Sequence, residues 1–369
     1  MQADTRQMTK REKLPDIVVA NQHFRFTGVS ATVEALVPHM QEQRAIALLD
    51  LGGLDLPQTW TFRDILRQGW SRPEQGKTRI WHARRDVEML TGLFLKWVLW
   101  QPWKVVFTSA APKRHGAFLR WLINRMDAII VTSQRSAEFL DWYSVIISHG
   151  VDTDIFVPPA DKLEANETGG LPGKYAIGSF GRIRPSKGSD LFVEAMIELL
   201  PRYPEFSAFL TGLSTPAEQE FRADLERKIA EAGLGERIVF LGDLSGEEIR
   251  NWYRRCTICV AASRREGFGL TPMEAMASGA VAVCSGAGFW PELIRPGQNG
   301  ALFETGNRAS LVAALEPFMA EPLQTQALGE KARRYVVRHH SIRGEADQIL
   351  DLYAALQNGD VPRTVSGKD

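Results

Sequence analysis

Two glutamates, Glu266 and Glu274, stand eight positions apart in the stretch REGFGLTPMEAMASG, which covers residues 265–279. Gly267 and Gly269 lie between them, and because glycine has no side chain, a ligand can approach the backbone amides closely there. Carboxylates bind sugar hydroxyls well and phosphates poorly, whereas the amides at a helix start bind phosphate. The spacing therefore indicates a site for a phosphorylated sugar.

A helix start is predicted in the middle of this stretch. Thr271 suits the N-cap, Pro272 suits the first helical position, and Glu274 follows the cap by three residues, as in a capping box. A helix N-terminus carries unpaired N–H groups and a partial positive charge, which favours an anion. The alternative is that Glu274 only caps the helix and that Glu266 is a solvated loop residue.

A second loop with the composition of an anion site follows the predicted strand 175–181. Its sequence is GSFGRIRPSKG over residues 178–188, and it contains Arg182 and Lys187, two cations five positions apart. A guanidinium can bind two phosphate oxygens and an ammonium acts as a point charge, so the pair suits a diphosphate; a solvated basic turn is the alternative. No Walker A motif occurs, which disfavours a P-loop kinase or NTPase.

The length and composition indicate a globular protein of two domains. A chain of 369 residues exceeds one ordinary core, and 44% hydrophobic with 24% charged residues is typical of a soluble fold. The formal net charge is zero, so no nucleic-acid partner is expected. No apolar run spans a bilayer and the N-terminus has no secretory signal, so we expect a cytoplasmic protein.

The three cysteines, Cys256, Cys259 and Cys284, provide no disulfide framework, which agrees with a reducing compartment. Cys256 and Cys259 form a CxxC, but they lie in the apolar run RRCTICVAAS, with no second CxxC and no histidine nearby. Buried thiols are therefore predicted rather than zinc ligands, and neither a metal nor a cofactor is expected.

Short apolar runs alternate with amphipathic stretches along the chain, which is typical of parallel sheets flanked by helices. The fold class is therefore α/β, with two doubly wound Rossmann-like domains facing each other across a cleft. The predicted parts are an N-terminal domain (15–150), a linker (151–174), a C-terminal domain (175–340), a helix packing back on the first domain (342–357) and a disordered tail (358–369).

Three motifs, in this order and spacing, resemble the retaining glycosyltransferases of the GT-B fold, family 4: HGVDTDIF (149–156), GRIRPSKG (181–188) and EGFGLTPMEAMASG (266–279). The resemblance covers essentially the whole second domain. It implies that Glu266 contacts the donor sugar and that Glu274 contacts the nucleotide ribose.

The same resemblance implies further donor contacts. Arg182 and Lys187 would bind the diphosphate and act in catalysis, and the segment LGDLSGEE (241–248) would hold the base, which makes Asp243 and Leu244 candidates. The remaining implied donor-binding residues are Gly181, Gly267, Phe268, Gly269, Leu270 and Thr271.

The first domain resembles the family less closely. Gly28 stands alone at a predicted helix start, where the family has a glycine pair that approaches the donor phosphate and the acceptor. Where many members have a histidine after the fourth strand, this chain has FTS (107–109). His115 and His82 are the candidate substitutes, although a lone histidine is more often a packed or surface residue. Arg84, beside His82, is a candidate for the acceptor or phosphate loop.

Other phrases, IWHARRD (80–86), FTSAAPKRHGAFLRWLINRMD (107–127) and SGAGFWPELI (285–294), are similar to those of bacterial lipopolysaccharide-core mannosyltransferases. This resemblance implies GDP-mannose as the donor and a glycolipid such as Kdo-lipid A as the acceptor. A UDP-sugar donor is the alternative. An acceptor of this kind would place the protein at the inner face of the cytoplasmic membrane.

The charge pattern independently suits an anionic acceptor or a membrane surface. Between Trp60 and Arg125 there are thirteen lysines and arginines against four acidic residues, and seven of the ten tryptophans. Basic residues attract anionic headgroups, and tryptophan favours the membrane interface. The alternative is that the tryptophans are core residues and the cations are solvated; Trp97, at helical spacing with Leu90 and Phe94, is predicted to be core.

The resemblance implies transfer of a hexose from a sugar nucleotide with retention of configuration. Arg182 and Lys187 would stabilise the leaving diphosphate, and Glu266 would orient the sugar. No carboxylate is obviously placed as a nucleophile, which favours front-face transfer over a covalent intermediate. Two alternatives remain open: a nucleotide-sugar isomerase on the same fold, and a non-catalytic membrane-surface protein.

Overall fold

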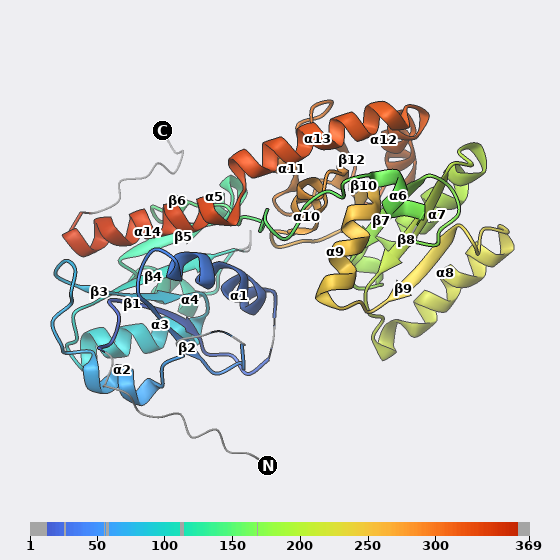
Figure 1. Cartoon of the computed structure of the whole chain (residues 1–369). Helices are drawn as coiled ribbons and strands as arrows, with labels where there is room; N and C mark the ends of the chain where they lie inside the picture. The colour runs from blue at the N-terminus through green and yellow to red at the C-terminus, as the bar shows by residue number, and fades with distance from the viewer. Residues whose placement is uncertain are drawn as a thin grey trace, which may run out of the picture.

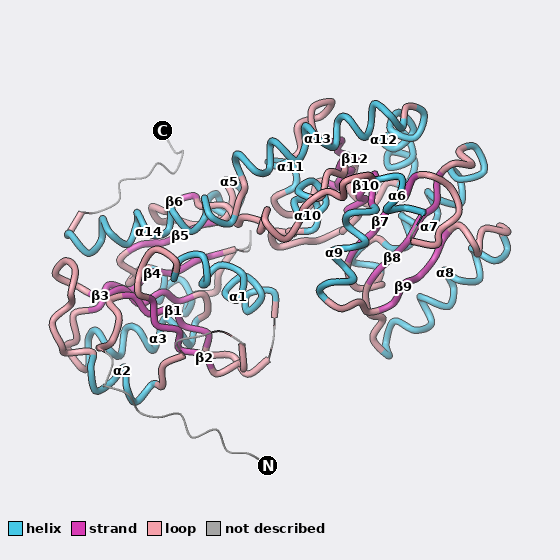
Figure 2. Tube along the Cα trace, in the orientation of Figure 1, coloured by secondary structure: helices cyan, strands magenta, loops and turns pink. Residues whose placement is uncertain are grey.

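The computed structural model describes residues 13–25, 27–54, 56, 59–110, 114–167 and 169–360. It contains two parallel six-stranded sheets with helices packed against them, as Figures 1 and 2 show. The first sheet is formed by the N-terminal part of the chain and the second by the C-terminal part. The fold is therefore α/β, with two doubly wound domains, as the sequence predicts.

The N-terminal sheet has the strand order β2-β1-β3-β4-β5-β6. The order reverses between β1 and β3, and doubly wound sheets bind ligands at such a switch point. The chain leaves β1 toward Gly28 and leaves β3 at Arg84, so both candidate residues follow strands of the switch point. The strands are β1 (Ile17–Asn21), β2 (Ile46–Asp50), β3 (Arg79–Ala83), β4 (Trp103–Ser109), β5 (Ala128–Val131) and β6 (Val145–Ile146).

The C-terminal sheet has the order β12-β11-β10-β7-β8-β9, and its switch point lies between β7 and β10. The loop after β7 carries Arg182 and Lys187, and the loop after β10 carries Glu266. The two predicted donor motifs therefore meet at one place. The strands are β7 (Tyr175–Phe180), β8 (Phe206–Thr211), β9 (Ile238–Gly242), β10 (Cys256–Ala261), β11 (Val281–Ser285) and β12 (Gly300–Phe303).

Helices connect the strands and cover the sheets. In the N-terminal part they are α1 (Gly28–Gln41), α2 (Phe62–Gln68), α3 (Asp86–Leu93), α4 (Ala117–Ile123) and α5 (Gln134–Glu138). Next come α6 (Lys162–Glu167), α7 (Ser189–Leu199), α8 (Gln219–Glu231), α9 (Gly246–Arg255) and α10 (Thr271–Ala277). The last are α11 (Trp290–Leu293), α12 (Arg308–Ala320), α13 (Pro322–His339) and α14 (Ile342–Asn358).

The last helix, α14, lies against the N-terminal domain (Figure 1). Its apolar residues, among them Ile349 and Tyr353, share one buried cluster with residues of α1 and of the first sheet. The chain therefore crosses between the domains twice. The crossings are bonded to each other, because the Val151 N–H donates to the His340 carbonyl and the Ile342 N–H donates to the Val151 carbonyl, both at 2.9 Å.

The boundary predicted for the tail is wrong by at least one residue. Asn358 still belongs to α14, and Gly359 ends the helix with a φ of 93°, a left-handed conformation that glycine adopts without strain. The rest of the predicted tail, residues 361–369, lies outside the described residues. The predicted linker contains the helix α6, in which the Lys162 ammonium donates to the carbonyls of Cys256 and Gly279 at 2.8 Å.

The three cysteines are free and buried, as predicted. Burial raises the pKa of the Cys256 thiol to about 12 and that of Cys284 well above its usual range. These thiols are therefore protonated packing groups in β10 and β11.

The prediction that Trp97 packs in the core is wrong. Leu90, Phe94 and Trp97 are 41%, 43% and 45% exposed, although they follow helical spacing. The segment is apolar on two faces, and a π-helical turn over Phe94–Val98 follows α3. The residues that this segment buries are Glu88, Met89, Gly92, Leu93 and Leu95.

Exposed tryptophans gather on one side of the N-terminal domain. The Trp70 indole donates to the Leu99 carbonyl at 2.9 Å. The Arg125 guanidinium lies 3.9 Å from the ring centre of Trp121 and 5.9 Å from that of Trp97. We call the exposed residues Trp70, Trp97, Trp100 and Trp121 the tryptophan face; Trp81 and Trp103 are buried and Trp60 is partly buried.

Candidate active site

A cavity of about 770 Å³ lies between the two domains and is lined by loops from the switch points of both sheets. It therefore brings together residues far apart in the sequence. The predicted residues that line it are Gly28, Arg84, His115, Lys187, Glu266, Gly267, Phe268, Gly269, Leu270, Thr271 and Glu274. Gly181 and Arg182 line an adjoining pocket, which shares Lys187, Glu266 and Thr271 with the cavity.

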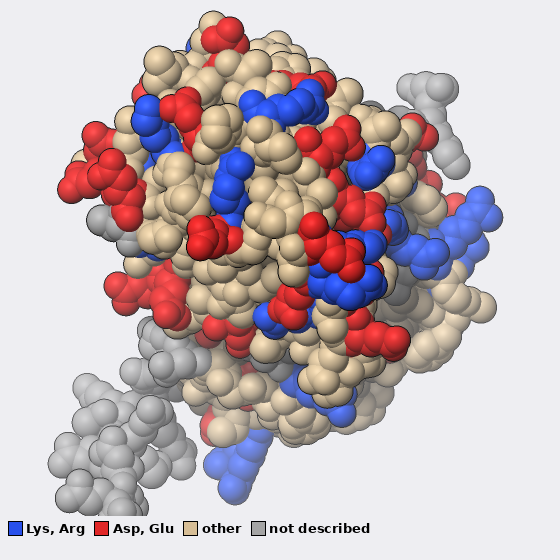
Figure 3. Space-filling model, turned by 90° about the vertical axis from the view of Figure 1, so that its right-hand side faces the viewer, with Lys and Arg blue, Asp and Glu red and all other residues tan. Residues whose placement is uncertain are grey.

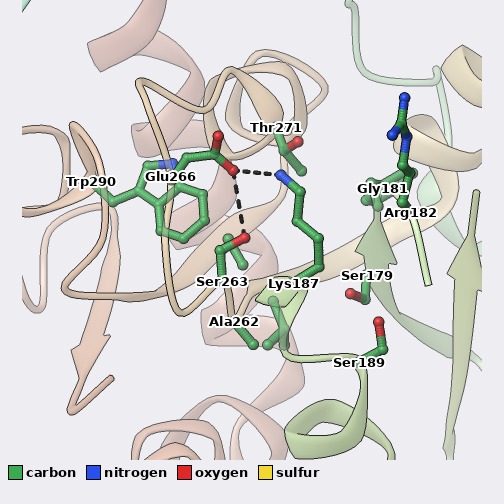
Figure 4. Close-up of a pocket in the computed structure, with 13 residues that line it drawn as sticks. Ser179, Gly181, Arg182, Lys187, Ser189, Ala262, Ser263, Glu266, Thr271 and Trp290 are labelled. Carbon is green, nitrogen blue, oxygen red and sulfur yellow. Dashed lines mark hydrogen bonds and ion pairs between the residues drawn. The ribbon is translucent and has the colours of Figure 1, made fainter. Parts of the chain in front are cut away.

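Lys187 and Glu266 form an ion pair on the wall that the C-terminal domain contributes to the cavity. The Lys187 ammonium lies 2.5 Å from a carboxylate oxygen of Glu266, and both side chains are mostly buried, with 26% and 18% exposed. Figure 4 shows this contact, with Ser263 also within reach of the same oxygen at 3.5 Å. Glu266 is thus a fixed, paired carboxylate rather than a solvated loop residue.

Glycines shape the two loops that carry this pair. Gly188, directly after Lys187, has a φ of 73°, and a Cβ there would lie 2.1 Å from the carbonyl oxygen of Ala262. Gly269 has a φ of 85° and a carbonyl that accepts a hydrogen bond from the Trp290 indole at 2.9 Å. Only glycine allows both the left-handed conformation and the close approach. Trp290 therefore supports the loop that contains Gly269, and the sequence analysis does not identify it as a site residue.

The start of α10 differs from the prediction. Leu270 is the N-cap, with no capping bond from its side chain, and Thr271 is the first helical residue. Glu274 makes no capping box. Its carboxylate accepts a hydrogen bond from the Tyr253 hydroxyl at 2.6 Å and lines the cavity. The alternative that Glu274 only caps the helix is therefore excluded.

Glu274 and Tyr253 lie in an apolar setting. Burial raises the pKa of the Glu274 carboxyl, and the hydrogen bond from Tyr253 opposes that rise. Burial and the neighbouring Glu274 raise the pKa of Tyr253 well above its usual range, so the phenol is a permanent donor. Phe180 stacks on Tyr253 with ring centres 3.8 Å apart. Tyr253 and Phe180 are site residues that the sequence reasoning missed.

On the opposite wall, Gly28 begins α1 and a Cβ there would meet nothing within 4 Å. Arg85 braces this loop. Its guanidinium donates to Thr27 at 2.9 Å, to Asn21 at 2.8 Å and to Glu88 at 2.9 Å. Arg85 is therefore a positioning residue that the sequence reasoning missed, and both Arg85 and its neighbour Arg84 line the cavity.

His82 does not line the cavity, which corrects its prediction as a site residue. It is fully buried, with one ring nitrogen 2.7 Å from the Thr108 hydroxyl and the other 2.5 Å from the Tyr353 hydroxyl. Burial, followed by the charge of Arg84, lowers its pKa well below the usual range. His82 is therefore a neutral packing group behind Thr108, which does line the cavity.

The other predicted residues have different surroundings. His115 lines the cavity, as does His149, whose ring nitrogen lies 2.8 Å from the Glu345 carboxylate. Asp243 is exposed after β9, and Leu244 packs against the cluster that contains Phe180 and Tyr253. Within the described residues no group of three or more histidine, cysteine or acidic side chains could hold a metal.

The comparisons with known proteins agree with this geometry. Residues 161–335 match the family "Glycosyl transferases group 1". The chain is 42% identical to the lipopolysaccharide core biosynthesis mannosyltransferase LpcC of Rhizobium leguminosarum bv. viciae, over 92% of this chain and 96% of that protein. It is 39% identical to the lipopolysaccharide core biosynthesis mannosyltransferase LpsB of Rhizobium meliloti (strain 1021), over 92% and 97%.

A solved structure, Anabaena Alr3699/HepE in complex with UDP, superimposes with a TM-score of 0.78 at 19% identity, covering 92% of this chain and 99% of that one. This likeness shows the fold, which is GT-B. The identity of 42% over 92% of the chain establishes that it belongs to the group 1 glycosyltransferases, in agreement with the family match. The protein is thus an enzyme of glycosyl transfer.

Proposed function

We propose that the protein transfers mannose from GDP-mannose, with retention of configuration, to a lipopolysaccharide-core glycolipid such as Kdo-lipid A. The observation that carries the proposal is the Lys187–Glu266 pair at the wall of the cavity between the domains. The names of the two relatives support the choice of mannose and of the core acceptor.

The chemistry follows from the charges on the donor wall. Arg182 is exposed at the adjoining pocket, and Lys187 would exchange its bond to Glu266 for one to the donor diphosphate. These cations and the amides of residues 269–271 would stabilise the charge that develops on the leaving group, without a metal. Glu266, released from Lys187, would accept hydrogen bonds from the sugar hydroxyls.

The anomeric configuration of the product tests the proposal. GDP-mannose and lipid A carrying an acidic keto sugar are incubated with the enzyme, and proton NMR follows the anomeric signal from the first turnover. We expect the α-linked product, with GDP released only when the acceptor is present. A β-linked product would contradict retention, and interconversion of the sugar nucleotide without acceptor would support the isomerase.

The donor base and sugar need their own test. Thermal unfolding is measured with GDP-mannose, UDP-glucose and ADP-glucose, because a ligand that binds the folded state raises Tm by mass action. We expect the largest shift with GDP-mannose, and loss of that shift in K187M. A larger shift with UDP-glucose would overturn the proposed donor while leaving the proposed transfer intact.

We also propose that the tryptophan face rests on the membrane that carries the acceptor. Trp100 is 85% exposed and adopts a φ of 53°, a conformation that costs energy for a non-glycine residue and is retained at functional surfaces. The outer side of the C-terminal domain differs from the tryptophan face. Positive and negative side chains are interspersed on it (Figure 3), and they form ion pairs along α8. Among the described helices, none is both long and apolar enough to cross a bilayer.

Vesicle sedimentation tests this placement. We expect binding to vesicles with anionic lipid, weaker binding to zwitterionic ones, and loss of binding in W97S and W100S. L323S is the matched control, because Leu323 is 69% exposed on α13 in the other domain. Equal binding by all variants would exclude the tryptophan face as the contact.

A further inference from the structure

Arg84 is a buried cation that lines the cavity. It is 8% exposed, and its Nε and Nη1 atoms have no hydrogen-bond partner in the described parts of the chain. Folded proteins pair buried guanidinium groups almost without exception, since water is lost from every donor on burial. A buried guanidinium with two nitrogens lacking a partner in the described residues, at the wall of a substrate cavity, indicates a group that binds a ligand.

Arg79, at the other end of the same strand, shows what a structural arginine looks like in this protein. It is fully buried, and both terminal nitrogens donate: Nη1 to Leu14, Pro15 and Asp16, and Nη2 to Ser71. Its Nε has no partner in the described residues, as in Arg84, so the two arginines differ at the terminal nitrogen Nη1. Arg79 lies at the amino end of β3, away from the cavity, whereas Arg84 follows the carboxyl end, where doubly wound sheets bind ligands.

The carboxylates that face Arg84 are already engaged. Glu88 accepts the backbone N–H groups of Arg84 and Arg85 at 2.7 and 3.1 Å and also pairs with the Arg85 guanidinium. Glu345 accepts the Gly150 N–H at 2.8 Å and lies 2.8 Å from the ring of His149. Both attract Arg84 electrostatically, but within the described residues neither forms an ion pair with it.

We propose that the Arg84 guanidinium binds an anionic group of the acceptor, either the carboxylate of an acidic sugar or a phosphate ester on the glycolipid. A guanidinium matches both groups because it can donate two parallel hydrogen bonds. The donor is the less suitable source, since Arg182 and Lys187 already supply cations for its diphosphate from the opposite wall. The inference rests on the proposed function and names the acceptor feature that it recognises.

Three acceptors separate the possibilities: lipid A bearing an acidic keto sugar, the same glycolipid with the sugar carboxyl reduced to hydroxymethyl, and the same glycolipid without its phosphates. Steady-state kinetics are measured for the wild type, R84Q and R84K. We expect the wild type to lose about 10–100-fold in kcat/KM on whichever acceptor lacks the recognised anion.

R84Q should show the same loss of kcat/KM with the intact acceptor. It should show no further loss with the acceptor that lacks the recognised anion, because the substitution and the altered acceptor remove the same interaction. R84K keeps the charge but cannot donate two parallel hydrogen bonds, so its kcat/KM with the intact acceptor should lie between those of the wild type and R84Q. The donor KM should stay within about two-fold of the wild type. Discrimination by R84Q equal to that of the wild type, or a raised donor KM with an unchanged acceptor KM, would overturn the proposal.

Two further measurements keep this test independent of the proposed transfer. Acceptor binding without donor, followed by thermal shift, should show a Tm increase with the intact glycolipid that R84Q loses; no increase in the wild type would contradict the inference. R79Q is the matched structural control. It should lower Tm by about 5–10 °C, whereas R84Q should leave Tm unchanged or raise it. A comparable fall in R84Q would make Arg84 a structural arginine.

Discussion

The two walls of the cavity are each supported by a buried tyrosine, and the two tyrosines hold different groups. On the C-terminal wall, the Tyr253 hydroxyl donates to Glu274, which itself lines the cavity. On the N-terminal wall, the Tyr353 hydroxyl contacts His82, and His82 contacts Thr108, which lines the cavity.

The difference lies in what reaches the substrate. The C-terminal wall presents charged groups, Glu266, Glu274 and Lys187, each already engaged by a neighbour from the same domain. The N-terminal wall presents a hydroxyl and the glycine loop together with charged residues, among them Arg85, Asp86 and the buried Arg84. Within the described residues, Arg84 forms no ion pair. This difference agrees with the proposed roles of the two walls, which are donor binding for the first and acceptor recognition for the second.

The largest effect that tests this comparison is expected at Glu266. E266Q removes the charge but keeps the volume, and we expect kcat to fall on the order of 10²–10³-fold because the sugar loses a positioning contact. Initial rates with radiolabelled donor measure the effect. E205Q breaks the exposed Lys174–Glu205 pair in the same domain and should retain wild-type rates. Equal losses in both variants would contradict the assignment.

The next effect is expected for the two donor-side cations. K187M should lower kcat/KM by about 10²-fold and R182Q by about ten-fold, because each removes a charge-assisted contact to the leaving diphosphate. Competition by free GDP should weaken in parallel. K174M serves as the control, since Lys174 is paired at the surface of the same domain. Unchanged GDP affinity in K187M would place the diphosphate elsewhere.

A smaller effect, which depends on pH, is expected for Tyr253, which supports the wall formed by the C-terminal domain. Y253F removes the hydrogen bond that holds down the pKa of Glu274, so that pKa should rise further. The proposed role of Glu274 is to bind the donor as the ionised carboxylate, so the acid limb of donor kcat/KM should move to higher pH. The donor KM should rise roughly three- to ten-fold at neutral pH. A lowered or unchanged acid limb would contradict this prediction.

The smallest effect on catalysis is expected for Tyr353, which supports the wall formed by the N-terminal domain. Y353F leaves a buried nitrogen of His82 without its partner, and we expect a loss of about 1–3 kcal/mol in the free energy of unfolding. Urea titration measures it. The donor KM should remain at the wild-type value, in contrast to Y253F. A donor effect as large as that of Y253F would remove the distinction between the two walls.

The sequence predicts which residues of the C-terminal wall come together, because these residues follow strands directly. Arg182 and Lys187 come after β7 and Glu266 after β10, and the adjacency of these strands at a switch point is a property of the fold. The partner of Glu274 could not be predicted in this way. Tyr253 lies on α9, and nothing in the local sequence distinguishes a capping glutamate from one that turns inward.

The wall of the N-terminal domain is less predictable, because its residues are held by partners distant in the sequence. His82 has its partner Tyr353 at a sequence separation of 271, so no local pattern marks it as a buried group. The prediction for Trp97 is wrong because helical spacing identifies an apolar stripe but not which of two stripes faces the core. The roles of His115, Asp243 and Leu244 remain predictions.

The return of α14 to the first domain has a consequence for the order of folding during synthesis. One of the two buried clusters of the N-terminal domain includes Ile342, Ile349 and Leu356, so this cluster stays incomplete until the ribosome has passed these residues. The C-terminal domain emerges in full before them. The half of the enzyme that is made second can therefore finish folding first, and a premature stop within α14 would leave a finished donor domain attached to an unfinished partner.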